Sequence, residues 1–574
     1  MINTGGKGMK VLVIGGSAGG ASTAARVRRL NEEAEIKMFE KGRDVSFSNC
    51  SLPYYTGGII SSSKALIMMS PQEFKSKHNI DVFTRTEVVA INKDNKTITV
   101  KDLQTGEERE EAYDKLVLST GTAPVLPKSI KGIDLPHVFT IRDVTDVERL
   151  EVRLGEEGTE DVVVVGGGFI GVEVAENLKT KGKNVTLIEG MDQILAPYDY
   201  DMVQVLHKEL DDNGVNLVVS ANVTEITENE VKAVKDGKEF TVPAKAVIMS
   251  VGARPQTELA VKAGLEIGET GGIKVDHCYR TSDPDIYAVG DAIESYNALS
   301  HKPGRIALAG PTQRQARAAA DHICGIASPN KGFIGSSCIK VFNQNAACTG
   351  LNEKTAAALG YKFDSVLIFP SDKVGIMPGS HYMVFKLVFE IPTGKILGAQ
   401  AIGKGECDKR VDVIATLITM GGTLEDLKDL ELCYAPPFST AKDVVNMAAL
   451  VGLNILNGRI KQVHVSEVRK LVEEGAYIID VRSEGEYAQG HLKNAHLIPL
   501  PELRDRMDEI PRDVPVYLHC RSSQRSYYAN CTLIENGYTN VHNISGSFLG
   551  ISLYEYFNDK TQGREPIVTN YNFK

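Results

Sequence analysis

Two of the nine cysteines stand in surroundings that could make a thiol reactive. Cys50 follows Asn49 in a polar run, whereas Cys520 directly follows Val516–His519, which is expected to be a strand, and precedes Arg525 by five residues. Backbone N–H groups in a strand-to-helix turn bind anions, and with a guanidinium they would stabilise a thiolate or persulfide at Cys520. A thiolate attacks disulfides and sulfane sulfur. The other cysteines lack paired metal-ligand spacing, so most are expected to be small buried residues.

Two glycine-rich turns could hold nucleotide phosphates. In the first, which begins at Gly15, Ser17 replaces the middle glycine of G-x-G-x-x-G; the second matches fully, with Gly166, Gly168 and Gly171. Glycines let the backbone approach a pyrophosphate, and the helix that follows offers free N–H groups and positive potential. For a single turn, an ordinary strand-to-helix connection is an equally good explanation.

Each turn has an acidic partner at the end of the next strand, Glu40 in the first case and Glu189 in the second. A carboxylate at this place accepts hydrogen bonds from ribose hydroxyls, and it repels a 2′-phosphate. Glu189 therefore favours NADH over NADPH, although Lys181 and Lys183 are close enough in sequence to oppose this preference. Two turns that both have an acid favour two dinucleotide sites over ordinary connections.

The elements that position these turns are β-branched apolar runs followed by helix-compatible segments. Val11–Ile14 precedes the first turn and Val162–Val165 the second, and a third α/β pattern begins near Ile478. These patterns predict βαβ units with parallel sheets, and 574 residues are enough for three or four domains.

Composition and charge exclude some classes of function. Lys plus Arg number 64 against 74 Asp plus Glu, and the formal net charge is -10, so a broad nucleic-acid or anionic-membrane surface is not expected. The start of the chain lacks the apolar core of a signal peptide, and no apolar run approaches the length of a membrane span. We expect a cytoplasmic protein whose residues 1–8 are either a flexible leader or a remnant of cloning before a native start at Met9.

Three further motifs follow in a fixed order: Leu118–Gly121, Val251–Pro255 and Thr281–Asp291. Over about residues 9–452 the chain resembles the pyridine nucleotide-disulfide oxidoreductases, flavoproteins with two dinucleotide sites. The resemblance implies FAD and NADH as cofactors, with Asp291 on the flavin ribityl chain. The implied cofactor-binding residues are Gly15, Ser17, Ala18, Gly19, Gly20, Glu40, Ser46, Thr120, Gly121, Asp291, Gly166, Gly168, Gly171, Glu189 and Gly252.

The run from Ser46 to Tyr54 resembles the S-F-x-N-C-x-L-P-Y of coenzyme A-disulfide reductases and the related NADH oxidases and peroxidases. Dithiol members of the wider family carry C-x4-C, but position 55 here is Tyr55, so Cys50 must form its disulfide with another molecule. The resemblance implies that Cys50, next to Asn49, attacks a disulfide or persulfide. Electrons from NADH, passed through FAD, would regenerate the thiol.

Basic residues near the first turn could bind the phosphates of coenzyme A. Arg26 and Arg29 are three residues apart on one helical face, and the resemblance places them near the nucleotide, with Lys75 a weaker candidate. Without the resemblance, a solvated basic face explains them as well.

Tyr434 lies in a segment that resembles the one reaching the partner subunit's active site. The resemblance implies that Tyr434 donates a proton or hydrogen bond to the leaving thiolate. An aromatic residue packed at the dimer interface is an equally good explanation. Ile376-Met377 stands where many coenzyme A-disulfide reductases have two tyrosines, so the resemblance leaves open a smaller or different sulfur substrate.

The C-terminal part, about residues 463–560, resembles a single rhodanese domain. It has Asp480-Val481-Arg482, Gly490–Ala495 and the C-x4-R spacing from Cys520 to Arg525. The whole chain thus resembles the coenzyme A-disulfide reductase and rhodanese fusions. We predict a homodimeric NADH-dependent reductase of persulfide, polysulfide or coenzyme A disulfide. The alternatives are an NADH oxidase or peroxidase that forms a sulfenic acid at Cys50, and a sulfur carrier or redox-responsive binding protein with a vestigial flavin half.

The predicted fold is α/β, with two Rossmann-like domains for FAD and NAD, an α+β dimerisation domain and an α/β rhodanese domain. The expected boundaries are 9–122 and 250–330 for the FAD domain, 123–249 for the NAD domain, 331–452 for the dimerisation domain, 453–462 for a linker and 463–574 for the rhodanese domain.

Overall fold

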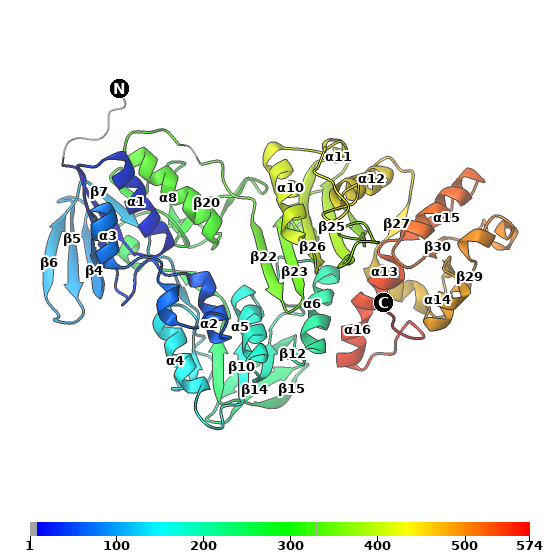
Figure 1. The fold of residues 1–574 in the computed structure, drawn as a ribbon, viewed down its shortest axis with the longest axis horizontal. Helices are drawn as coiled ribbons and strands as arrows, with labels where there is room; N and C mark the ends of the chain where they lie inside the picture. The colour runs from blue at the N-terminus through cyan, green and yellow to red at the C-terminus, as the bar shows by residue number, and fades with distance from the viewer. Residues whose placement is uncertain (1–7, 329, 574) are drawn as a thin grey trace. The chain divides into compact units, whose positions relative to one another are not determined.

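The computed structural model of the chain describes residues 8–328 and 330–573 (Figure 1). These residues form two compact units. Unit 1 contains residues 8–192 and 215–333, and unit 2 contains residues 193–214 and 334–573. Most of the proposed leader, residues 1–7, lies outside the described residues.

Unit 1 contains two parallel five-stranded sheets, each with a glycine-rich turn at the carboxyl end of a central strand. The central strands β1 and β10 are apolar and almost fully buried beyond their first residue, as expected where helices cover both faces. The first sheet has the order β19 (Ile286–Ala288), β7 (Lys115–Leu118), β1 (Lys10–Ile14), β2 (Glu35–Phe39), β3 (Asp81–Phe83). The second has the order β12 (Asn216–Val218), β11 (Asn184–Ile188), β10 (Asp161–Val165), β16 (Ala246–Met249), β9 (Val138–Phe139). The predicted βαβ units are present, because α1 (Ala18–Leu30) follows β1 and α5 (Phe169–Thr180) follows β10.

Unit 2 combines an antiparallel sheet and a parallel sheet. The antiparallel sheet has the order β22 (Ser336–Val341), β23 (Gln344–Gly350), β26 (Ile396–Gly403), β25 (Met383–Glu390), β24 (Phe363–Ile368). The parallel sheet has the order β27 (Gln462–Val463), β31 (Val541–Ile544), β30 (Val516–His519), β28 (Tyr477–Asp480), β29 (His496–Leu497). Helix α12 (Val444–Leu456) extends into the expected linker, residues 453–462, and β27 begins at the last residue of that linker.

Segment 193–214 belongs to unit 2 because its charged groups are anchored there. Lys386, a buried residue of β25, lies 2.8 Å from Asp201, 2.9 Å from Glu353 and 3.3 Å from Asp199. Helix α6 (Tyr200–Asp212) also packs on α16 (Ser547–Gln562). One lysine among three carboxylates is a buried ionic cluster that tolerates the loss of a partner poorly.

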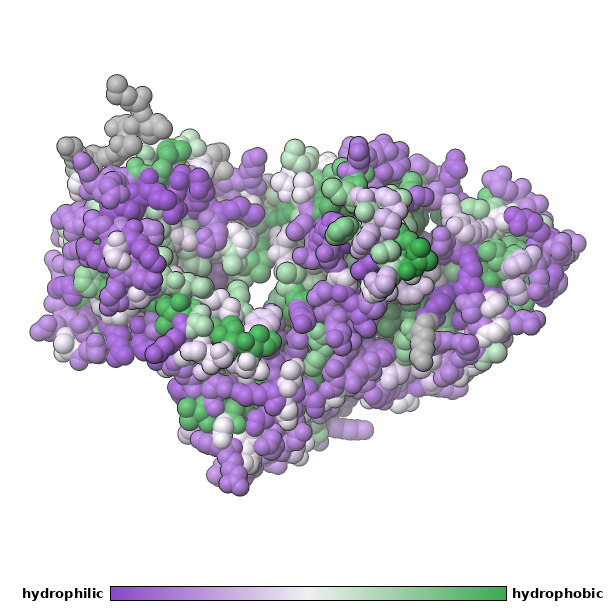
Figure 2. Space-filling view, in the orientation of Figure 1, coloured by the Kyte–Doolittle hydropathy of each residue, from purple (hydrophilic) through white to green (hydrophobic). Residues whose placement is uncertain are grey.

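None of the helices in residues 8–328 and 330–573 is long and apolar enough to cross a membrane. The face drawn in Figure 2 is mostly hydrophilic, with hydrophobic residues in small separate groups.

Candidate active site

The first glycine-rich turn is held against its neighbours so closely that side chains would not fit at two positions. Gly15 has φ +94, and an added Cβ would lie 2.2 Å from the Ser119 carbonyl oxygen. At Gly20 an added Cβ would lie 1.8 Å from the carbonyl oxygen of Gly15. Helix α1 begins at Ala18, after Ser17, so its first N–H groups are directed at the turn. The turn therefore has the close packing and free donors that a pyrophosphate requires.

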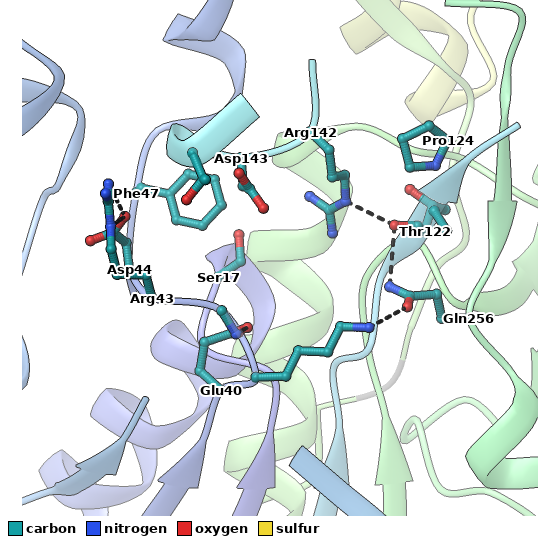
Figure 3. Close-up of a pocket in the computed structure, with 14 residues that line it drawn as sticks. Ser17, Glu40, Arg43, Asp44, Phe47, Thr122, Pro124, Arg142, Asp143 and Gln256 are labelled. Carbon is teal, nitrogen blue, oxygen red and sulfur yellow. Dashed lines mark hydrogen bonds and ion pairs between the residues drawn. The ribbon is translucent and has the colours of Figure 1, made fainter. Parts of the chain in front are cut away.

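Glu40 ties this turn together from the end of β2. One carboxylate oxygen accepts a hydrogen bond from the backbone N–H of Gly16 at 2.8 Å, and the other from Gly42 at 2.7 Å. Beside it lies a cavity of about 250 Å³ (Figure 3). The cavity is lined by Ser17, Glu40, Lys41, Gly42, Arg43, Asp44, Phe47, Thr122, Ala123, Pro124, Arg142, Asp143, Thr145 and Gln256. These residues fit the nucleotide part of FAD.

Asn49 connects the cysteine motif to this cavity. With its amide nitrogen facing Ser17 Oγ and the Phe47 carbonyl oxygen, both at 3.1 Å, its oxygen accepts from Arg142 Nη1 at 3.0 Å. Cys50 follows in the turn Asn49–Ser51, immediately before α2 (Leu52–Thr56). Asn49 thus holds the backbone that carries Cys50 against the phosphate turn.

Cys50 is exposed at the surface of unit 1, but part of its side chain packs against the protein. This desolvation, followed by the charges of Glu173 and Asp291, raises the pKa of the Cys50 thiol. Burial also raises the pKa of Asp291, against the opposing effect of Arg142. Asp291 is therefore close enough to Cys50 and to Arg142, a residue of the cavity wall, for their charges to interact.

Glu173, near the beginning of α5, was not predicted from the sequence. Burial raises the pKa of Glu173 to about 7, and the Tyr54 hydroxyl lies 3.3 Å from Glu173 Oε1. Glu173 lies two residues after Gly171, but nothing in the sequence shows that α5 comes close to the turn that carries Cys50. The sequence therefore offered no reason to select it. At neutral pH this carboxyl is partly protonated next to Cys50.

The second glycine-rich turn has the same construction as the first. Glu189 accepts hydrogen bonds from the backbone N–H groups of Gly167 at 2.5 Å and Met191 at 2.7 Å. The two lysines that could oppose its preference are engaged elsewhere: Lys181 lies 2.6 Å from Glu151, and Lys183 donates to the Thr159 carbonyl oxygen at 2.7 Å. Neither lysine is therefore available to bind a 2′-phosphate next to Glu189.

Three other glycines in the predicted cofactor set differ in their surroundings. Gly121 has φ +63, and an added Cβ would lie 3.2 Å from Arg142 Nη2; Gly252 has φ +112. Next to Gly121, Thr120 donates to the Gln256 carbonyl oxygen at 2.7 Å. The added Cβ at Gly19 would lie 2.7 Å from the Ser119 hydroxyl. At these three positions a glycine lets the backbone adopt a left-handed conformation or lie close to a neighbouring group.

A basic groove of about 550 Å³ lies between α1, α8 (Ala309–Ile323) and the segment that leads to Cys50. It is lined by Ala21, Ser22, Ala25, Arg26, Arg29, Ser46, Met69, Phe74, His78, Gln313, Arg314 and Arg317. Arg314 and Arg317 were not predicted, because they are almost 300 residues away in sequence. Ser46, expected at the FAD site, lines this groove.

The basic residues of the first helix have different roles. Arg26 faces the groove and is held by Asp321 at 2.7 Å. Arg28 is buried, and its guanidinium donates to backbone carbonyl oxygens, including His78 at 2.9 Å, so it is a structural residue. Lys75 forms a surface ion pair with Asp81 at 2.8 Å and does not line the groove as described.

Cys520 lies at the carboxyl end of β30 and is 1% exposed. The loop that follows leads into α15 (Gln524–Glu535), and Ser526 Oγ lies 3.7 Å from Cys520 Sγ. Arg525, expected to add positive charge, is bound by both oxygens of Glu486 at 2.6 and 2.7 Å. This pair holds the pKa of Glu486 at about 2 and offsets the charge of Arg525.

Tyr434 and Ile376 both belong to unit 2 and are accessible. Tyr434 is 50% exposed, and Ile376, at the position where a tyrosine is absent, is 90% exposed.

Comparison with known proteins identifies the class. Residues 9–316 match the family described as "Pyridine nucleotide-disulphide oxidoreductase", residues 336–444 match its dimerisation domain, and residues 464–553 match the "Rhodanese-like domain". The chain therefore belongs to the pyridine nucleotide-disulphide oxidoreductase family, and it carries a C-terminal rhodanese-like domain. The predicted family, the predicted fold class and the assignment as an oxidoreductase are confirmed.

Several particular proteins are similar to it. "Coenzyme A disulfide reductase" of Staphylococcus haemolyticus is 33% identical over 443 residues, which are 76% of this chain and 98% of the relative. Reduced Bacillus anthracis CoADR-RHD superposes with a TM-score of 0.92 at 42% identity, covering 96% of this chain and 99% of that one. A NAD-dependent persulfide reductase from A. fulgidus gives a TM-score of 0.89 at 36% identity, covering 94% and 99%.

Proposed function

We propose that the protein is an FAD-dependent, NADH-consuming reductase of coenzyme A persulfide, coenzyme A disulfide or polysulfide, active as a cytoplasmic homodimer. The observation that carries this proposal is the position of Ser46, four residues before Cys50, in the wall of a groove that also presents Arg26, Arg29 and Arg314. An anion-binding groove whose wall includes a residue only four positions before a reactive thiol suits a thiol substrate with phosphate groups. The similar proteins named for coenzyme A disulfide and persulfide support the same substrate class.

The site residues have distinct roles in this proposal. The two glycine-rich turns, with Glu40 and Glu189, would hold FAD and NADH, and the FAD when bound supplies a two-electron carrier between NADH and sulfur. Asn49 orients the Cys50 turn. The Cys50 thiolate attacks the substrate S–S bond, and the product is held as a mixed disulfide or as a Cys50 persulfide, according to which sulfur is attacked. Tyr434, from the other subunit, would donate a hydrogen bond to the leaving thiolate.

The proposed reaction balances with one NADH per S–S bond. Coenzyme A persulfide, NADH and a proton give coenzyme A thiol, hydrogen sulfide and NAD⁺. Glu173, partly protonated at neutral pH, lessens the repulsion that a full negative charge would impose on the Cys50 thiolate. In the rhodanese-like domain, Cys520 would accept and present sulfane sulfur.

The test is anaerobic NADH oxidation with coenzyme A persulfide, coenzyme A disulfide, polysulfide or peroxide as the acceptor. Cys50→Ser should abolish reduction of every sulfur substrate and leave the flavin reducible by NADH, whereas Cys278→Ser, in the same unit, should behave as wild type. Turnover of peroxide alone would favour an oxidase or peroxidase. Retained persulfide turnover in Cys50→Ser would refute the assignment.

The groove has its own test. Arg29→Gln should raise KM for coenzyme A persulfide by about tenfold, the usual effect of losing one charge-assisted hydrogen bond. The KM for inorganic polysulfide, which has no phosphate, should not change. Equal effects on both substrates would mean that the groove does not bind the nucleotide.

A further inference from the structure

Two buried serines with left-handed backbone conformation lie next to Cys520. Ser523, in the loop, has φ +73, and Ser547, at the start of α16, has φ +49. Ser547 is 0% exposed and Ser523 is 9% exposed. This conformation is uncommon for residues other than glycine. A serine that occupies it in a buried place indicates that its hydroxyl group contributes something that glycine could not.

The two hydroxyl groups, the buried hydroxyl of Ser526 and the Cys520 backbone form one connected network, in which Ser526 Oγ lies 3.4 Å from Ser547 Oγ and 3.7 Å from Cys520 Sγ. The Cys520 N–H donates to Ser547 Oγ at 3.1 Å, and the two serine hydroxyl oxygens are 3.2 Å apart. Ser523 Oγ lies 3.1 Å, and Ser547 Oγ 3.3 Å, from the carbonyl oxygen of Ile544. Ser547 Oγ is also 4.0 Å from Cys520 Sγ.

Each serine has a single hydroxyl hydrogen, so the network has a choice of donors. If Ser523 donates to the Ile544 carbonyl oxygen, the Ser547 hydrogen can turn to Cys520 Sγ. A negative sulfur favours this orientation, while a neutral sulfur lets Ser547 donate to Ile544 instead. Because Glu486 binds Arg525 and offsets its positive charge, the hydroxyl groups are the polar hydrogen-bond donors close to the sulfur.

We propose that Ser523 and Ser547 are positioning residues for sulfane sulfur at Cys520. Ser547 fixes the Cys520 backbone N–H and turns its hydroxyl hydrogen to the sulfur in the thiolate and persulfide forms, while Ser523 holds the Ile544 carbonyl oxygen. The proposal rests on the sulfur-carrying role proposed for Cys520. With thiosulfate as donor, the Cys520 thiolate forms a bond to the outer sulfur, the S–S bond of thiosulfate breaks, and sulfite leaves with the electron pair. Cyanide then takes the outer sulfur as thiocyanate and restores the thiolate.

The experiment measures thiosulfate–cyanide sulfur transfer and the Cys520 persulfide, by mass spectrometry, in the full-length protein. The variants are Ser547→Ala, which keeps the strained side chain without the hydroxyl, and Ser547→Gly, which removes both the hydroxyl and the strain. Ser552→Ala is the matched control, since Ser552 is a buried serine of the same helix whose hydroxyl has no hydrogen-bond partner among the described residues.

Both Ser547 variants should lower kcat by about tenfold, the usual effect of one hydrogen bond, with KM for thiosulfate nearly unchanged. Their Cys520 persulfide should also be lost faster, although Ser547→Gly should have a higher Tm than Ser547→Ala. Wild-type kcat in Ser547→Gly would show that only the backbone conformation matters and would overturn the proposal, as would an equal loss in Ser552→Ala. If the wild type itself forms no Cys520 persulfide, the proposed sulfur-carrying function fails instead.

Discussion

The second glycine-rich turn permits a test in which the same methyl group is added at two places with different expected results. At Gly171 the added Cβ would lie 1.9 Å from the carbonyl oxygen of Gly166 and 2.6 Å from the Ser250 hydroxyl. At Gly168 the backbone has φ -73, and the added Cβ would meet no atom of the described residues within 4 Å. Gly171→Ala should therefore damage the fold, and Gly168→Ala only the binding of NADH.

The magnitudes follow from these contacts. Nonbonded atoms in contact are about 3.5 Å apart, whereas the added Cβ at Gly171 would lie 1.9 Å from the Gly166 carbonyl oxygen. Helix α5 must therefore move away from the turn that follows β10. Overpacking of this kind costs about 1–3 kcal/mol and occasionally more. Alanine at Gly168 suits the backbone, but Gly168 is the N-cap of α5, where alanine is less favourable than glycine, so the gain of about 0.4–1 kcal/mol from a less flexible unfolded chain is offset and stability should change little. Its methyl group would stand where the pyrophosphate approaches, and a loss of about 1.4–2.8 kcal/mol corresponds to a 10- to 100-fold higher Kd for NADH.

The assay is thermal unfolding of the flavin-loaded protein together with rapid-mixing measurement of flavin reduction over a range of NADH concentrations. Gly168→Ala should keep Tm and the bound flavin while its half-saturating NADH concentration rises. Gly171→Ala should lower Tm by several degrees, as a change of 1–3 kcal/mol does in domains of about this size. Wild-type NADH affinity in Gly168→Ala would refute the view that this turn holds the pyrophosphate, and an unchanged Tm in Gly171→Ala would refute the packing argument.

Three other expectations concern charge. Glu173→Gln removes a negative charge near Cys50 and should move the midpoint of Cys50 alkylation to lower pH; a shift to higher pH would contradict the assigned electrostatics. Glu189→Gln should reduce the preference for NADH over NADPH, measured as the ratio of kcat/KM values, by about tenfold, since a unit repulsion near a surface exceeds about 1.4 kcal/mol. Lys386→Met should lower the free energy of unfolding by about 3–5 kcal/mol at pH 8, measured in denaturant. Burial raises the folded-state pKa of Asp199 to about 6, above its ordinary 3.8, so this carboxyl destabilises the fold as the pH rises through 6. The deficit of the Lys386 variant should therefore be smaller at pH 5, and a larger deficit there would contradict the cluster's assigned role.

The sequence alone was sufficient to predict the family, the order of the motifs and the two strand–turn–helix units that begin at Gly15 and Gly166. Each of these features is local, because the strand, the turn, the helix and the acid lie within about 30 residues and are specified by backbone conformation. The contexts of Cys50 and Cys520 are local for the same reason, and both could be recognised from neighbouring residues.

The tertiary structure decided which charged groups remain available to a ligand. Arg28 and Arg26 look alike in sequence, but packing gives the first to backbone carbonyl oxygens and the second to a groove that Arg314 completes from a distant helix. Arg525 fits its motif, yet a glutamate 39 residues away offsets its charge. Ser547 carries no motif at all, and only the packing of α16 against the loop brings its hydroxyl to Cys520. The partner of a charged or polar side chain depends on contacts between distant segments, and these exist only once the chain has folded.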